Sequence, residues 1–294
     1  MRSVRCVVCK LCLAACVLGL AAWSLPPEVA AHSDKAAVAV KTYGKITVDG
    51  DLEDWTRRVE STNWAGRLEI KKGDVQAWMR AAPVYLNALT GTALSGAIDG
   101  PRDLAATVYT LWDAQRLYVA AVIDDDTLVT RYDRGDIWQD DMLEVLLDCR
   151  HDAVTQTLTQ DDEYRIGISP ANNGRSYPVI WVWENPQAET VLGAVTAASQ
   201  RTPTGYRIEA SVPWEVLQGC QPSVGGLIGF NFSVSDKDGD QPRTVVAWSG
   251  SRAADPSQFG HLYLVDAPVD LLASDELRPQ EERSTLDVLT GPER

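Results

Sequence analysis

Histidine, methionine and phenylalanine are scarce in this 294-residue sequence, with three of each. So few imidazole and thioether groups argue against a haem or a histidine-rich metal centre. Basic residues are also in deficit, because 27 lysines and arginines face 41 aspartates and glutamates, for a net charge of −14. Nucleic acids and anionic membrane surfaces bind basic faces, so neither is expected as a partner. Tryptophan, at ten residues, is abundant, and some indole surface is expected to serve recognition.

The common catalytic motifs are missing as well. The sequence contains no G-x-S-x-G elbow, Walker loop, G-x-G-x-x-G or H-E-x-x-H. Only His151 and His261 fall within the expected core, so a Ser-His-Asp triad has few places to form. Acidic groups at 124–126, 140–144 and 161–163 offer carboxylate pairs for glycoside hydrolysis. Acidic residues in such loops are more typical of solvated or cation-binding faces, and we interpret them so.

The first 31 residues have the pattern of a secretory signal peptide. Basic residues between positions 2 and 10 precede an apolar run over 11–25, and Val29-Ala30-Ala31 offers small residues for cleavage. No later stretch holds about 20 consecutive apolar residues, so no transmembrane helix is expected. The sequence therefore predicts a protein that is secreted, periplasmic or on the cell surface.

Four of the six cysteines lie in this segment with the C-x2-C-x2-C-x3-C spacing of bacterial ferredoxins, namely Cys6, Cys9, Cys12 and Cys16. The residues between them are mostly apolar, so we interpret the spacing as a coincidence within the signal peptide. Leu13-Ala14-Ala15-Cys16 also resembles a lipoprotein cleavage box, which leaves a lipid anchor at Cys16 as an alternative. Cys149 and Cys220 form a disulfide in an oxidising compartment or stay as buried thiols.

Short β-branched and aromatic runs dominate the rest of the chain. About ten such runs, separated by turn residues, predict an all-β sandwich or barrel. The expected strands are 46–48, 107–112, 116–123, 142–149, 163–169, 177–183, 191–199, 206–213, 228–236, 244–249 and 261–265. A long, partly ordered insertion is expected at 60–106, after the first strand. The domain organisation is a flexible leader over 32–42, one core over 43–266, and an acidic tail, expected to be disordered, over 267–294.

Six short motifs occur in a recognisable order. They are ITVDGDLEDW (46–55), LWDAQRLYV (111–119), IWQDDMLEVLLD (137–148), YRIEASVPW (206–214), IGFNFSVSD (228–236) and DPSQFGHL (255–262). Together they resemble the family 9 carbohydrate-binding module over about residues 45–266. The resemblance implies a jelly-roll-like β-sandwich with bound calcium, no catalysis of its own, and association with glycoside hydrolases such as xylanases. The best-known type grips the reducing end of a glucan or xylan chain between two tryptophans.

The resemblance assigns Trp138 to the first indole platform and Glu144 and Arg165 to sugar-bonding positions. An indole covers the apolar C–H face of a pyranose ring, while carboxylate and guanidinium groups bind its hydroxyl rim. A regular strand through this segment would put Trp138 and Glu144 on one face. The alternative for Glu144 and Arg165 is a structural ion pair between neighbouring strands.

The sequence departs from the family at two contact positions. Ala253 and Ala254 stand where the second platform tryptophan is expected, and Ser233 replaces a sugar-contacting glutamine. Trp181 and Trp183 alternate along one predicted strand, so they form a replacement platform or pack in the core. These departures leave open the sugar, the linkage and the choice between chain-end and internal binding.

For calcium, Asp125 matches an aspartate that recurs in the family, and the neighbouring Asp124 supplies further oxygen atoms. Calcium takes roughly six to eight oxygen ligands, so other groups must complete the site. The Asp236-Lys-Asp-Gly-Asp240 segment fails the EF-hand spacing and is interpreted as a hairpin turn.

The expected function is therefore non-catalytic binding of a glucan- or xylan-type polysaccharide, with calcium as cofactor and a glycoside hydrolase as partner. Three alternatives remain. One is a glycoside hydrolase that uses Asp141 and Glu144 as its carboxylate pair. Another is an adhesion domain that has lost its ligand. The last is a haem-binding sandwich, for which the axial candidates are Met79, Met142, His151 and His261.

Overall fold

The computed structural model describes residues 33–42, 45–55, 84–86, 91–153, 158, 161–171, 176–250, 252 and 254–266. The predicted signal peptide, the acidic tail over 267–294, Met79 and Ala253 lie outside these residues. Within them, no helix has the length and apolarity needed to cross a lipid bilayer.

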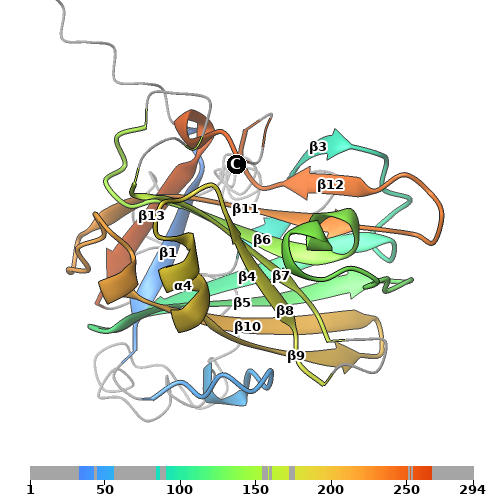
Figure 1. Ribbon diagram of the computed structural model, residues 1–294, viewed down its shortest axis with the longest axis horizontal. Helices are drawn as coiled ribbons and strands as arrows, with labels where there is room; N and C mark the ends of the chain where they lie inside the picture. The colour runs from blue at the N-terminus through green and yellow to red at the C-terminus, as the bar shows by residue number, and fades with distance from the viewer. Residues whose placement is uncertain are drawn as a thin grey trace, which may run out of the picture.

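Hydrogen-bonded strands join into one sheet that makes up most of the structure (Figure 1). Its main path runs through β8 (Val179–Trp183), β7 (Glu163–Ser169), β6 (Met142–Asp148), β11 (Leu227–Asp236), β13 (Gly260–Val265), β1 (Ala36–Lys41), β4 (Leu104–Trp112), β5 (Arg116–Asp125), β10 (Gly205–Pro213) and β9 (Thr196–Thr202). Off this path, β2 (Val84–Leu86) pairs with β4, while β12 (Thr244–Ala247) joins β11 to β3 (Thr92–Ser95). Among the strands that the structure describes, only β1 pairs in parallel, with β13 and with β4.

The sheet folds back on itself, so that two layers enclose one core. In Figure 1, β13 and β1 run steeply along one side, between the β8-β7-β6-β11 part and the β4-β5-β10-β9 part. Side chains from both parts belong to the same buried cluster, including Val145 of β6, Phe232 of β11, Val119 of β5 and Ile208 of β10. Burial of this apolar surface is the main stabilising contribution. The prediction of an all-β, sandwich-like fold is confirmed.

Most strand predictions agree with the structure to within a few residues, and the one over 163–169 coincides with β7. The strand expected over 191–199 is wrong in its first half, because Ala188–Ala194 forms the helix α4 and β9 starts only at Thr196. Val191 is fully buried, and its backbone carbonyl accepts the N–H of Val195 at 2.9 Å. Apolar residues four apart share one face of a helix, and this spacing was missed.

The N-terminal part differs more. The leader expected to be flexible over 32–42 contains β1, whose small and apolar side chains fit between β13 and β4. The strand expected at 46–48 is absent, but Ile46 is buried with Leu52 and Trp55 against Tyr118. Of the expected insertion at 60–106, the structure describes β2, β3 and the start of β4, which all pair with the main sheet.

Short helical turns lie between some of the strands. They are η1 (Arg134–Gln139), η2 (Trp214–Val216) and η3 (Pro256–Gln258), all of the 3-10 type. The helix η1 packs on β7 and β8 and carries the residue expected to serve as the indole platform.

Cys149 and Cys220 form a disulfide with a Cα–Cα distance of 4.5 Å, which resolves the alternative left open by the sequence. The bond joins the residue after β6 to the loop after η2, across 71 residues of sequence. A cross-link over so long a segment restricts the unfolded chain, and links of this length contribute about 4 kcal/mol.

We expect the double variant Cys149→Ala/Cys220→Ala to unfold at a lower temperature by roughly 8–16 °C, because about 4 kcal/mol of stabilisation is lost. Differential scanning calorimetry of the variant beside the oxidised parent measures this shift. The parent in strong reductant serves as the control and should match the variant. An unchanged midpoint in both samples would show that the cross-link does not stabilise the fold.

Candidate functional site

The outer face of β6 and β11 is polar and yet buried. β6 is buried along its whole length, whereas β4 alternates between buried and half-buried residues. On β11, Phe230, Phe232 and Val234 enter the core, so Asn231, Ser233 and Ser235 lie on the opposite side, and these too are buried. Buried polar groups need hydrogen-bond partners, which Asn231 finds in the backbone of Ser249 and Ser233 in the side chain of Glu144.

Glu144 provides the centre of that polar network. It lies opposite Ser233 on β11 and opposite Gly167 on β7. One of its carboxylate oxygens accepts a hydrogen bond from Nε of Arg165 at 2.6 Å, and the other accepts one from Oγ of Ser233 at 2.9 Å. Glu144 is only 3% exposed, whereas the Arg165 side chain is 23% exposed. The ion pair given as the alternative for these two residues is therefore present, and Arg165 is its solvent-facing member.

Trp138 lies on η1 rather than on a strand, so the regular strand geometry that would have put it on one face with Glu144 does not reach it. The turn closes where the Asp140 N–H donates to the carbonyl of Ile137 at 3.2 Å, and the Asp140 carboxylate accepts the backbone N–H of Arg131. Ile137 is fully buried and anchors the turn, while Trp138 is 42% exposed. The indole expected to be a platform is thus open to solvent.

Trp181 and Trp183 are half-buried on β8 and brace η1. The indole N–H of Trp183 donates to the carbonyl of Gly135 at 3.3 Å, and the Trp181 ring lies against the same glycine, where a Cβ would approach its indole nitrogen to 3.2 Å. The guanidinium of Arg165 lies over the Trp183 ring, 4.8 Å from its centroid. Gly167 allows this packing, because a Cβ there would come within 2.5 Å of Trp183. Both indoles are less exposed than that of Trp138.

The sequence analysis missed Arg243, which precedes β12. Its Nη1 donates to the carbonyl of Trp138 and lies 3.5 Å from Oγ of Ser235, and its guanidinium is 5.1 Å from the Trp138 ring centroid. Burial lowers the pKa of Arg243, Glu144 raises it and Arg165 lowers it, so all three charges are close. The β11–β12 hairpin, which pairs Ser235 with Val245, was the only available signal for this placement.

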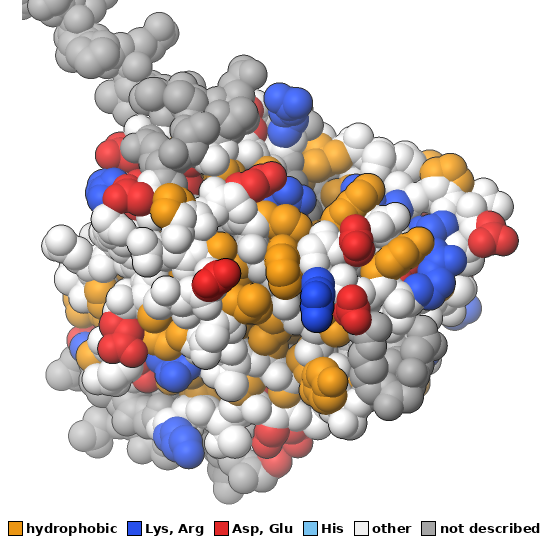
Figure 2. Space-filling view, viewed as in Figure 1, with side chains coloured by type: hydrophobic (Ala, Val, Ile, Leu, Met, Phe, Trp, Pro, Cys, Tyr) orange, Lys and Arg blue, Asp and Glu red, His pale blue; other side chains and the backbone are white. Residues whose placement is uncertain are grey.

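Figure 2 shows this face of the molecule, where hydrophobic side chains are interleaved with basic and acidic ones over η1 and β8. The second indole wall is not supplied by Ala254, which is partly buried against the small cluster of Leu146, Ala247 and Phe259. The sequence expectation of a missing wall therefore agrees with the position of Ala254.

A group of buried aspartates lies at the end of β5 and β11. Asp125, Asp141 and Asp236 each bring one carboxylate oxygen within 4.8 Å of the others. Oδ2 of Asp125 and Oδ1 of Asp236 are buried without a hydrogen-bond partner, while Asp141 accepts the backbone N–H groups of Val129 and Lys237. Asp124 is not in this group, because β-strand alternation turns it away from Asp125.

The electrostatics of this aspartate group are unfavourable in the absence of a cation. Burial raises the pKa of all three carboxyl groups, to about 9 for Asp141, about 8 for Asp236 and about 6 for Asp125. Charge repulsion adds to this, from Asp125 and Asp236 on Asp141 and first from Asp238 on the other two. A cation bound by the three oxygens would remove that repulsion and give partners to the two unpaired oxygen atoms.

The alternative catalytic and haem sites find little support among the described residues. Asp141 belongs to the aspartate group and Glu144 to the Arg165 pair, and both are almost fully buried. Met142 is buried within β6. Nε2 of His151 and Nδ1 of His261 hydrogen bond to each other at 2.8 Å.

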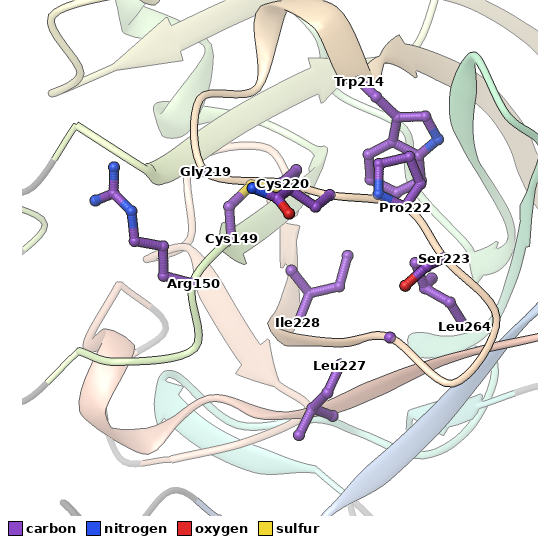
Figure 3. A pocket seen from close by; sticks show the side chains of 12 residues that line it. Cys149, Arg150, Trp214, Gly219, Cys220, Pro222, Ser223, Leu227, Ile228 and Leu264 are labelled. Carbon is purple, nitrogen blue, oxygen red and sulfur yellow. A yellow bond between two sulfur atoms is a disulfide. The ribbon is translucent and has the colours of Figure 1, made fainter.

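A separate cavity of about 370 Å³ lies beside the disulfide (Figure 3). Its lining comes from the loop after η2, the start of β11 and the end of β13, and includes Cys220, Pro222, Leu227 and Leu264. None of the residues predicted as site residues from the sequence lines this cavity.

Comparisons with solved structures find the same fold. A carbohydrate binding module family 9 from Caldicellulosiruptor kristjanssonii in complex with cellotriose aligns with a TM-score of 0.54 and 20% identity, covering 80% of this chain and 96% of the other. The same kind of module from that organism in complex with glucose gives a TM-score of 0.51 and 18% identity, covering 80% and 98%. At this identity the likeness concerns the fold alone.

Curated proteins are also similar to this chain in sequence. The chain is 26% identical over 269 residues to "Endo-1,4-beta-xylanase A" of Thermoanaerobacterium saccharolyticum, covering 88% of this chain and 19% of the relative. It is also 26% identical over 244 residues to "Exoglucanase XynX" of Acetivibrio thermocellus, covering 82% and 18%. The chain thus spans only about a fifth of the length of either relative.

The chain also matches a family model. The family model "Carbohydrate family 9 binding domain-like" matches residues 73–267, which is more than half of the chain. The match covers the strands that carry Glu144, Arg165 and Ser233, and the turn that carries Trp138. With the two-layered β-fold and the solved modules of the same architecture, it shows that this chain belongs to the carbohydrate family 9 binding domain-like family.

Proposed function

We propose that this chain binds carbohydrate of the glucan or xylan class and catalyses no reaction on it. One observation carries the proposal: the exposed indole of Trp138 adjoins a buried polar network through which two guanidinium groups, Arg165 and Arg243, reach the surface. An indole face with polar donors around it complements a pyranose, which has apolar C–H faces and a hydroxyl rim. Solved family members with bound cellotriose and glucose support the same class of ligand.

The proposed contact is one-sided. Arg243 covers one face of the Trp138 indole, and Ala254 contributes no opposing ring. A sugar would stack on the remaining indole surface and receive hydrogen bonds from Arg165, while Glu144 and Ser233 orient that arginine. Trp181 and Trp183 support η1 in this proposal and are not the stacking surface.

We also propose that the protein is exported and acts beside a glycoside hydrolase. The signal-peptide pattern over 1–31 and the disulfide between Cys149 and Cys220 both support an oxidising compartment. The xylanase and exoglucanase relatives support a partner that acts on the same polymers, although this chain matches only a small part of each. The alternative is that a lipid anchor at Cys16 holds the exported protein at a membrane.

Reducing-sugar release separates binding from catalysis. The purified protein is incubated with xylan and with amorphous cellulose, and pull-down of each polymer is measured in the same samples. We expect retention on at least one polymer and no release above a buffer control. Release that is lost in Glu144→Gln or Asp141→Asn would instead support the hydrolase.

The variant Trp138→Ala should lose at least tenfold in affinity for the retained glycan, because the stacking surface is removed while the fold stays intact. Isothermal titration calorimetry measures the affinity, and thermal unfolding checks the fold. Leu227→Ala is the matched control, since Leu227 is a comparably exposed apolar residue (40% against 42%). It lies at the start of β11, whereas Ser233 and Ser235 of the site lie near the end of that strand. Equal affinity for Trp138→Ala and the parent would remove Trp138 from the site.

We propose that Asp125, Asp141 and Asp236 bind calcium. The residues present fit the ion, because their oxygen donors converge within 4.8 Å, two of the buried carboxylate oxygens lack a partner, and hard oxygen ligands suit calcium. Bound calcium would neutralise the group and hold the ends of β5 and β11 together. Asp124, expected as a second ligand, accepts a hydrogen bond from Thr204 instead and is not included.

Calcium should raise the unfolding temperature, and more so at about pH 8 than at about pH 5, because bound protons must leave before the metal binds. Without metal, these carboxyl groups have pKa values above those of the unfolded chain. Their contribution to stability is therefore present at acid pH and is lost as the pH rises through about 6 to 9. Thermal melts with calcium and with chelator at both pH values test this.

Asp141→Asn should reduce the calcium-dependent shift, while Asp124→Asn, a neighbour outside the group, should keep it. A shift that is identical in the parent and in Asp141→Asn would show that any bound calcium lies elsewhere.

A further inference from the structure

Arg243 differs from the other arginine of the site in what surrounds its charge. The Nε of Arg165 is 2.6 Å from the Glu144 carboxylate, and its Nη1 is 3.6 Å from Glu184. Arg243 has no carboxylate within ion-pair distance among the residues that the structure describes, and its hydrogen bonds go to the Trp138 carbonyl and, weakly, to Ser235. Its positive charge is thus held in the site by neutral groups.

The orientation of Arg243 leaves a specific edge of the guanidinium available. Both of its hydrogen bonds to protein use Nη1, so Nε and Nη2 have no protein acceptor among the described residues. These two N–H groups point the same way and form the fork that matches the two oxygens of a carboxylate. The same guanidinium stacks on the exposed Trp138 indole, which fixes the plane of the fork.

The local electrostatics favour an anion at this edge. Burial is the largest influence on the pKa of Arg243 and lowers it, and the neighbouring Arg165 lowers it further by a smaller amount than Glu144 raises it. The nearby Glu144 acts in the opposite direction, but its two oxygens already bond to Arg165 and Ser233. An anionic group from the ligand would supply the missing partner.

We propose that Arg243 binds the carboxylate of an acidic sugar, so that the preferred ligand carries a uronic acid. This inference rests on the proposed carbohydrate-binding function and names the class of sugar within it. In this arrangement Trp138 stacks against a ring of the glycan, while Nε and Nη2 of Arg243 donate hydrogen bonds to the carboxylate of a uronic acid substituent. The chain as a whole is acidic, but charges beyond about 8 Å are largely screened at physiological salt, so the local guanidinium decides.

The decisive comparison uses two ligands that differ only in charge. One is a xylo-oligosaccharide substituted with a uronic acid, and the other is the same oligosaccharide with its carboxyl group reduced to an alcohol. Calorimetric titration of the parent protein at neutral pH gives both affinities. We expect the acidic form to bind at least tenfold more tightly, since hydrogen bonds to charged partners contribute roughly 1.5–3 kcal/mol.

Variants then assign the preference to Arg243. In Arg243→Gln the ratio of the two affinities should fall at least tenfold, and in Arg243→Lys it should be intermediate, because lysine keeps the charge but not the fork. Arg116→Gln is the matched control. That arginine also bonds to hydroxyl groups, at 2.8 Å to Ser211, but lies in the other layer, so its removal should leave the ratio unchanged. Thermal melts check that each variant folds. If Arg243→Gln does not fold, Arg243→Lys alone tests the role of Arg243.

Each outcome bears on a different claim. Failure of the parent to bind either ligand, or other glucans and xylans, overturns the proposed function itself. Equal binding of the acidic and reduced forms overturns the acidic-sugar inference and leaves carbohydrate binding intact. A preference that survives unchanged in Arg243→Gln and Arg243→Lys overturns the role of Arg243.

Discussion

A buried carboxylate must be paired, and the one at Glu144 organises the whole candidate site. Its two oxygens take donors from β7 and β11, which fixes Arg165 and Ser233. Arg165 in turn stacks on Trp183, and the Trp183 indole donates to a carbonyl of η1. The exposed ring of Trp138 is therefore held in place through a chain of contacts that begins inside the sheet. A surface-exposed aromatic with such support is pre-organised, which lowers the entropic cost of binding a ligand.

β11 connects the site to the rest of the molecule. Its alternation puts phenylalanine and valine into the core, serines under the candidate sugar surface, and Asp236 at the aspartate group. Asp141 in that group accepts the backbone N–H of Val129, while the adjacent Asp140 closes the turn that bears Trp138. The proposed calcium and sugar sites thus share two segments of chain, and order in one supports order in the other.

The sequence was sufficient for the fold and for the position of the principal indole. The pattern of β-branched and aromatic runs between turn residues located β4, β5, β7, β10 and β11, and each of these strands turns side chains into the core. It failed for α4, where Val191 and Val195 are four apart and are also consistent with a strand. It also failed for β1, because a short run of alanines and valines carries no period of its own. That strand is specified by the two partners between which it lies.

The residues of the candidate site could be predicted only in part from the sequence. Trp138, Glu144, Arg165 and Ser233 belong to motifs, so they were found by resemblance. Arg243 belongs to none, and it reaches Trp138 only because the β11–β12 hairpin returns the chain to Ser235. Asp141 and Asp236 were visible as acids, but their convergence with Asp125 depends on β5 and β11 ending where β6 begins. Contacts of this kind are set by topology and are not encoded in any local pattern.

Replacing a second tryptophan by alanine changes what kind of selectivity the surface can have. Two indoles around a sugar gain free energy from apolar faces that many hexoses and pentoses share, so stacking discriminates weakly between them. Here Arg243 covers one face of the Trp138 indole. Guanidinium groups with fixed geometry would therefore supply a larger share of the binding free energy. A ligand that leaves such a group without a partner incurs the full desolvation cost, whereas a lost methylene contact costs much less. In the proposed site, alanine in place of a second indole would therefore shift selectivity from the shape of the ring to the polar groups carried on its rim.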